Sequence, residues 1–308
     1  MTDRSAGEDP GSDGESDGES DGDAGFRRRS RAWRHALVVV YLTCAGLLIP
    51  WIFHLLRRQP PVAISYHSSL LWALIAVLML SGLVATGVLY WRRSLYAVLT
   101  ATFTSTFLFI GAWFDVLTST GLLHKVLVVF AVAVQLPISV LSFVVAYRLC
   151  RDRATPAGGT RLVSAAFVVG AVLLVPTSVR RVVKVAPVVI ALHQRVTWSG
   201  LDIFEFAGLL ATGWCLRERS PWLAMVGTAT ATLLLSDALF NIVTSSDGSL
   251  LGGILMAVVA ELPLAALSLV LAAREVHSWH AGAGGPDPRD RADRPDRTTV
   301  PSGPVAEA

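Results

Sequence analysis

Charged residues are scarce in this chain: Asp, Glu, Lys and Arg make up 16% of its 308 residues, whereas a soluble domain is nearer a quarter charged. Cysteine is scarcer still, with three residues and no CxxC pair, which excludes a disulfide framework and argues against structural zinc. The HExxH, GxSxG and glycine-rich phosphate-loop motifs are all missing. We therefore expect a chain that is not an enzyme and that holds no cofactor and no catalytic metal.

Hydrophobic residues are abundant, at 53% of the chain. They form runs of about 20 residues, the length that a helix needs to cross the hydrocarbon core of a bilayer. The runs are Leu37–Leu56, Leu70–Tyr90, Leu95–Thr118, Leu122–Leu149, Leu162–Val179, Ser199–Leu216, Pro221–Thr244 and Leu250–Ala273. Charges between Arg180 and Arg195 interrupt the region of the fifth and sixth runs, so seven spans are an alternative count. The sequence predicts an all-α fold, a polytopic transmembrane helical bundle with eight spans.

The chain resembles itself after a shift of 126 positions. From His35 to Arg148 the alignment needs no gap, and about 33 of 114 positions are identical, as expected of a duplicated unit. The hexapeptide Gly82–Gly87 falls on Gly208–Gly213, for example. The repeated unit holds four spans, which supports a total of eight. Because four spans return the chain to the same side, we expect two parallel four-helix repeats related by a pseudo-two-fold axis along the membrane normal.

Arginine placement predicts the orientation of the chain. Five arginines lie between Arg27 and Arg34, and the turns at Arg92 and Arg217 also carry basic residues. By the positive-inside rule both termini are cytoplasmic, although the segment from Arg180 to Arg195 is an exception. Almost all bases are arginine, which suggests a bacterial source. We expect the plasma (inner) membrane of a bacterium.

Both ends of the chain are polar. Residues 1–25 hold nine acidic residues, and neither end has enough apolar side chains to offset the entropy of ordering. The predicted organisation is a disordered acidic tail with an arginine-rich end (1–34), a first four-helix repeat (35–149), a cytoplasmic linker (150–160), a second four-helix repeat (161–275) and a disordered tail (276–308).

Acidic residues inside the predicted spans are the candidate functional residues, because an ionised side chain there costs about 2.5–3.5 kcal/mol. Glu261 lies near the middle of the last span, two residues before Pro263, and Gln135 stands in the same relation to Pro137. Each proline should kink its helix. The whole candidate site is Glu261, Asp237, Asn241, Glu205, Asp202, Gln135 and Asp115, with His193, Arg180 and Arg181 as candidate partners.

The two repeats differ in these positions. The counterparts of Asp202, Glu205, Asp237 and Glu261 are Ala76, Met79, Gly111 and Gln135, so the acids gather in the second repeat. One interpretation is a cation or proton route from the outer face to Glu261; the other is a buried hydrogen-bonded network that fixes helix register. The repeated small residues, such as Gly82 with Thr86 and Gly208 with Thr212, indicate close helix packing.

Three functions follow as hypotheses. The first is permeation of an ion or small solute through the second repeat, with or without proton coupling. The second is a scaffold or sensor that binds partners or lipid through its tails, with anionic headgroups at Arg27–Arg34. The third is a membrane-embedded enzyme or a haem protein using the repeated pair His67 and His193, which we regard as an outlier. The lipid bilayer is the expected partner, and nucleic acid is not.

Overall fold

The long apolar runs become long helices in the computed structural model of the chain. The structure describes residues 19–57, 69–118, 121–151, 153, 161–184, 189–244 and 250–283, and it describes side chains over a narrower set, chiefly 31–50, 73–117, 125–151, 161–173, 196–241 and 251–280. The helices are α1 (Glu19–Arg57), α2 (Ser69–Trp91), α3 (Ala97–Thr118), α4 (Gly121–Phe130), α5 (Leu136–Arg151), α6 (Arg161–Lys184), α7 (Val189–Arg217), α8 (Leu223–Thr244), α9 (Leu250–Met256) and α10 (Leu262–Ala283). The π-helical turns η1 (Ala131–Gln135) and η2 (Ala257–Glu261) join α4 to α5 and α9 to α10. The described residues thus form eight helical rods, and the all-α prediction is confirmed.

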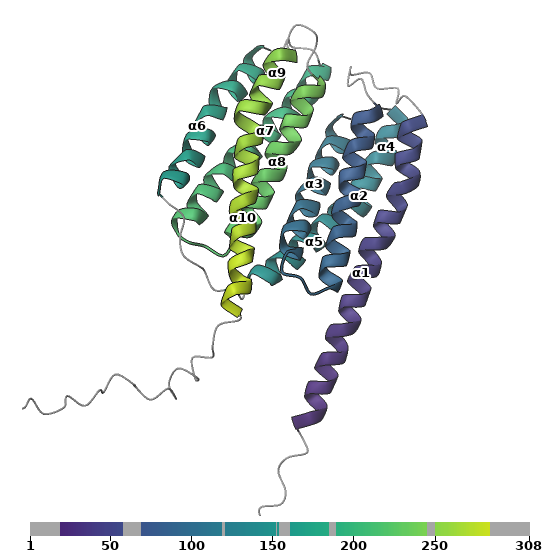
Figure 1. The fold of residues 1–308 in the computed structure, drawn as a ribbon. Coiled ribbons are helices and arrows are strands. Elements are labelled where there is room, and N and C mark those ends of the chain that lie inside the picture. Colours follow the sequence, from purple (N-terminus) through teal and green to yellow (C-terminus); the bar gives the residue numbers. More distant parts are fainter. Residues whose placement is uncertain are drawn as a thin grey trace, which may run out of the picture.

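Six of these rods are long and apolar enough to cross a membrane: α1, α2, α3, α4 with α5, α8, and α9 with α10. The fifth and sixth predicted runs fall on α6 and α7, which lie alongside the others (Figure 1). The apolar stretch described for α6 is Arg161–Leu173, while α7 carries Asp202 and Glu205 within its apolar part. The chain is therefore a multi-pass membrane protein with six helices that qualify by length and composition.

Helix α1 is longer than the predicted first span. It begins at Glu19, inside the segment 1–34 for which we expected disorder, and its 39 residues extend about 58 Å at 1.5 Å per residue. Its N-terminal part projects beyond the other helices (Figure 1). Helix α10 likewise continues to Ala283, past the expected end of the repeat at residue 275. Residues 1–18 and 284–308 of the predicted tails, and most of the linker, lie outside the described residues.

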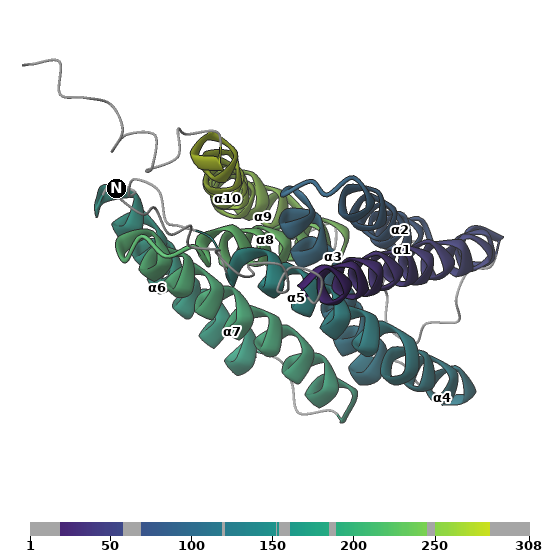
Figure 2. The same ribbon diagram turned by 90° about the horizontal axis from the view of Figure 1, so that it is seen from below.

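The eight rods form two groups of four, α1–α5 and α6–α10, lying side by side (Figures 1 and 2). Within the first group α1 packs on α2, α2 on α3, and α3 on α5. Within the second group the same order holds, with α6 on α7, α7 on α8, and α8 on α10. Between the groups α3 packs on both α7 and α8, so α3 and α8 lie at the centre of the bundle (Figure 2).

The prolines of the last helix in each group follow a π-helical turn. Pro137 lies two residues after η1, and Pro263 lies two residues after η2. Proline has no N–H to donate, and its ring clashes with the carbonyl four residues earlier, so a wider turn relieves the contact. The irregularity that we predicted as a kink is thus a π-helical turn ending at Gln135 or at Glu261.

Glycine and threonine bring neighbouring helices close together, as predicted. Thr86 and Thr104 join α2 to α3 through their hydroxyl oxygens at 3.1 Å, and Thr212 and Thr230 join α7 to α8 at 2.9 Å. A Cβ on Gly208 would lie 2.7 Å from the Thr230 hydroxyl oxygen, which a side chain does not permit. The two contacts are 126 residues apart along the chain.

Candidate functional site

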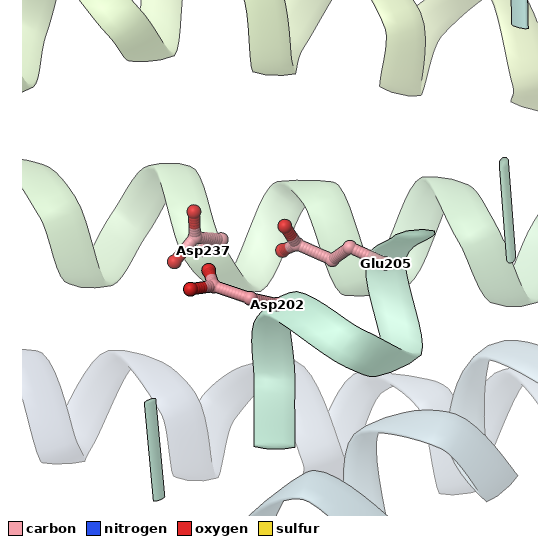
Figure 3. A group of neighbouring side chains, drawn as sticks. All are labelled: Asp202, Glu205 and Asp237. Atoms are coloured by element: carbon pink, nitrogen blue, oxygen red, sulfur yellow. The ribbon is translucent and has the colours of Figure 1, made fainter. Parts of the chain in front are cut away.

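Three carboxylates from two helices meet inside the second group (Figure 3). Asp202 and Glu205 are one turn apart on α7 and so share a helix face, and Asp237 comes from α8. One oxygen of each lies within 4.8 Å of the others. All three side chains are buried, at 4%, 0% and 1% exposure respectively. We call these three residues the acidic cluster.

A hydrogen-bonded amide connects the acidic cluster to Glu261. The Asn241 side-chain NH₂ donates to Asp237 Oδ2 at 2.8 Å and to Glu261 Oε1 at 2.7 Å. An amide NH₂ carries two protons, so one group can serve both carboxylates. Glu261 is 1% exposed, at the last position of η2. Buried polar side chains thus extend from the acidic cluster on α7 and α8 to the π-helical turn before α10, with hydrogen bonds from Asp237 through Asn241 to Glu261.

The first group contains the same pair with its chemistry exchanged. The Gln135 side-chain NH₂ donates to Asp115 Oδ2 at 2.8 Å, from η1 to α3. Asp115 is the counterpart of Asn241, and Gln135 is the counterpart of Glu261. In the first group the central helix supplies the carboxylate and the π-helical turn supplies the amide; in the second group the assignment is reversed. Each pair keeps one carboxyl group and one amide group.

The acidic cluster has no acidic equivalent in the first group. Its counterparts are Ala76, Met79 and Gly111, and a Cβ built on Gly111 would lie 2.3 Å from the Met79 terminal methyl. The Met79 side chain thus lies where a side chain on Gly111, the counterpart of Asp237, would begin. The same place in the fold is apolar in one group and acidic in the other.

Two serines of α5 serve packing. Ser139 and Ser105 donate to each other's backbone carbonyls at 2.8 and 2.9 Å, which ties α5 to α3. The Ser142 hydroxyl accepts a hydrogen bond from Tyr41 at 3.0 Å, which ties α5 to α1. The side chains of the candidate partners Arg180, Arg181 and His193, and that of His67, lie outside the described residues.

Aromatic rings fill the boundary between the two groups. Phe114 stacks on Phe240 with ring centroids 4.5 Å apart, and Trp198 meets both edge-on at 5.6 Å. Trp113 donates from Nε1 to the Thr197 carbonyl at 3.2 Å. The periodicity of the spans gave no sign of these contacts, because a tryptophan near a span end is ordinarily interpreted as a lipid-interface residue.

A small cavity lies beside these rings. Its volume is about 10 Å³, room for a single water, and residues of α2, α3 and α8 line it. Gly111, Phe114, Ser236 and Phe240 belong to the lining, whereas the acidic cluster and Glu261 do not. In this conformation the acidic residues are enclosed by protein.

Comparison with known proteins gives no relative: no family model, no curated protein and no solved structure matches the chain. The fold and the polar residues therefore carry the functional inference alone.

Proposed function

We propose that the chain consists of two parallel four-helix repeats with eight spans, and that both termini face the cytoplasm of a bacterium whose inner membrane holds it. The support is the 126-residue sequence repeat together with pairs of local features at the same spacing. These features are the π-helical turns, the threonine contacts and the order of helix packing within each group. Random similarity between apolar helices would not repeat irregular turns at a fixed spacing.

We propose further that the protein conducts an ion or small solute through its second repeat, and that the acidic residues carry protons or the permeating cation. The single observation that carries this proposal is the convergence of Asp202, Glu205 and Asp237 within 4.8 Å, with Asn241 linking them to Glu261. Neighbouring carboxylates repel one another when ionised, and their mutual repulsion favours uptake of a proton or a cation. Acidic side chains are also costly inside a bilayer and are typical of ion and proton pathways there.

The depths of the residues fit a route that enters from the end of α8. Asn241 and Asp237 precede the end of α8 at Thr244 by three and seven residues, or about 4 and 10 Å. Glu261 follows the start of α9 at Leu250 by eleven residues, or about 16 Å. Because the Asn241 amide donates to both Asp237 and Glu261, these polar groups lie together, within a few helical turns of that end of the second repeat. Because they are enclosed here, conduction requires a second conformation in which the helices around them separate.

Flux in proteoliposomes tests the proposal. Glu261→Gln introduces the residue that the first repeat has at this position, and its amide oxygen can still accept from Asn241, so the variant should fold. We expect flux of protons, or of sodium or potassium ions, to fall at least tenfold. The matched control is Gln135→Asn in the first repeat, which should leave flux unchanged. Equal flux in wild type and Glu261→Gln, or no flux in wild type above empty liposomes, would refute the proposal.

The first repeat also supplies a second, stricter variant. Exchanging Asp202, Glu205 and Asp237 for the residues at 76, 79 and 111 replaces the acidic cluster with packing that the protein already uses. We expect a folded protein without flux. A folded triple variant that conducts as well as wild type would assign the cluster to structure alone.

A scaffold or sensor is the second candidate, and the length of α1 favours it. The helix runs from Glu19 through Arg27–Arg29 to its apolar span Arg31–Pro50, whose first residues include Arg31 and Arg34. Such a basic helical extension at a membrane surface suits anionic headgroups. Deleting residues 1–34 should then abolish binding of the protein's soluble partner or of anionic vesicles and leave flux intact. In both candidates we propose no catalytic role.

A further inference from the structure

Two arginines adopt a backbone conformation that favours glycine. Arg93 and Arg219 have φ angles of 56° and 53°, and they are the non-glycine residues with positive φ in the described part of the chain. Each lies two residues past the end of its helix, α2 or α7. The next N–H closes the helix end: Ser94 donates to the Leu89 carbonyl at 2.9 Å, and Ser220 donates to the Cys215 carbonyl at 2.9 Å. In this type of C-cap the left-handed residue is usually glycine, because a Cβ is unfavourable there.

The arginine is kept at this position in both repeats. Arg93 with Ser94 matches Arg219 with Ser220, although most aligned positions differ. The neighbouring residue differs, because Arg92 corresponds to Glu218 in the second repeat. The two turns therefore share a positive charge at the position of Arg93 and Arg219 but not at the position before it. A general need for basic residues on this side of the membrane would be met equally well by Arg92, without the unfavourable backbone. The retained feature is a guanidinium group at one defined place.

The surroundings of the two arginines fit a membrane interface. Both side chains are exposed, and within the described residues neither has an ion-pair partner. Each turn is also tied to the other repeat by an aromatic stack three residues later. Tyr96 stacks on His280 at 5.4 Å between ring centroids, and Trp222 stacks on Tyr147 at 5.0 Å.

The end of α2 indicates where Arg93 lies relative to the lipid headgroups. The apolar span of α2 ends at Trp91, so Arg93 lies just outside the hydrocarbon core. Lipid phosphates lie at that depth, and tyrosine and tryptophan are enriched there. Guanidinium groups bind phosphate oxygens in a bidentate manner.

We propose that Arg93 and Arg219 form two equivalent binding sites for the phosphate groups of anionic lipids, on the side of the membrane that holds the termini. The sites are separate from the acidic residues and do not depend on the proposed permeation. The phosphate accounts for the guanidinium at a position where the backbone alone would favour glycine. The two-fold relationship of the repeats gives the stoichiometry of two lipids per chain.

Lipid binding to the full-length protein tests this inference. Native mass spectrometry with phosphatidylglycerol should show two retained lipids for wild type, one for Arg93→Gly or Arg219→Gly, and none for the double variant. We expect about tenfold weaker binding for each arginine removed, the usual effect of losing a charge-assisted hydrogen bond. The control Arg92→Ala removes a charge from the same turn and should keep both lipids.

Thermal unfolding in nanodiscs separates binding from folding. In phosphatidylcholine the double glycine variant should unfold at the wild-type temperature or above it, because glycine is favoured at both φ angles. In phosphatidylglycerol only wild type and Arg92→Ala should gain further stability. Two lipids retained by the double variant would overturn the proposal. An equal gain from inorganic phosphate added to phosphatidylcholine nanodiscs would also overturn it, because the ligand would then be the free anion.

Discussion

Phe114 stacks face to face on Phe240, the residue that follows it by 126 positions, with ring centroids 4.5 Å apart and planes 15° apart. The two rings occupy equivalent places in the aligned halves of the chain. In a two-fold arrangement a residue touches its own equivalent only where the axis passes. The stack therefore marks the proposed pseudo-two-fold axis, which runs between α3 and α8, the two central helices.

The stack should contribute measurably to stability. We expect Phe114→Ala and Phe240→Ala each to lower the free energy of unfolding by about 3–5 kcal/mol, as for other buried phenylalanines. The double variant should lose about 0.5–1.5 kcal/mol less than the sum, since that coupling belongs to the aromatic pair. Denaturant unfolding in detergent measures the cycle, with the exposed Trp91→Ala as the control. Strict additivity would show that the rings do not interact.

The carboxyl–amide pair in the first repeat should tolerate an exchange of its two groups. Gln135→Glu alone places a second carboxyl group beside Asp115 in a buried site, and we expect it to destabilise the protein by about 1–3 kcal/mol at neutral pH. Adding Asp115→Asn recreates the pairing of Asn241 with Glu261 and should restore stability to within about 1 kcal/mol of wild type. Thermal unfolding of Gln135→Glu and of the double variant measures the loss of stability and its recovery. A double variant no more stable than Gln135→Glu would mean that the exchange between repeats is incidental.

The sequence alone predicted the helical bundle well, because runs of about 20 apolar residues have few alternatives in a bilayer. Comparison of the two aligned halves of the sequence singled out Glu261 and Asp237 as acids of the second half, and the helix-face spacing grouped Asp202 with Glu205. These inferences need only the periodicity along one helix. Six helices qualify as spans by length and composition, and eight spans remain our proposal.

Contacts between helices could not be predicted in the same way. That Met79 fills the space beside Gly111, or that Asn241 reaches both Asp237 and Glu261, depends on how two helices are rotated and shifted against each other. A helix that is apolar on every face gives no indication in its sequence of which face meets a neighbouring helix. A tryptophan near a span end, such as Trp113, is ordinarily interpreted as a lipid-interface residue, whereas Trp113 packs against α7.

Gly200 should be intolerant of any side chain. A Cβ there would lie 2.5 Å from the Trp113 ring, a rigid group that also donates to the Thr197 carbonyl. We expect Gly200→Ala to destabilise the protein by about 1–3 kcal/mol through overpacking. Gly46 is the matched control, because it lies within α1 with nothing within 4 Å of its Cβ position. Gly46→Ala should stabilise by about 0.5–1 kcal/mol, the helix preference of alanine over glycine. Thermal unfolding measures both effects. Equal changes in unfolding temperature for Gly200→Ala and Gly46→Ala would contradict the close contact between Gly200 and Trp113.

Reporter fusions test the eight-span topology, which the composition of α6 and α7 leaves as a proposal. If both helices cross the membrane, an even number of spans separates residue 151 from the C-terminus. A reporter fused after Arg151 and one fused at the C-terminus should then both lie in the cytoplasm, as the positive-inside rule also predicts, and a third reporter between α6 and α7 should lie in the periplasm. A cytoplasmic signal from the third reporter would leave six spans, because the first two reporters give the same result for six spans as for eight. If only one of α6 and α7 crosses the membrane, these first two reporters must lie on opposite sides. A cytoplasmic signal from the first fusion and a periplasmic signal from the second would therefore leave seven spans, and the parallel relation of the repeats would be lost. Arg217→Glu with Arg219→Glu provides the control for orientation: weakening the positive charge between α7 and α8 should raise the fraction of misoriented second repeats without changing the first fusion.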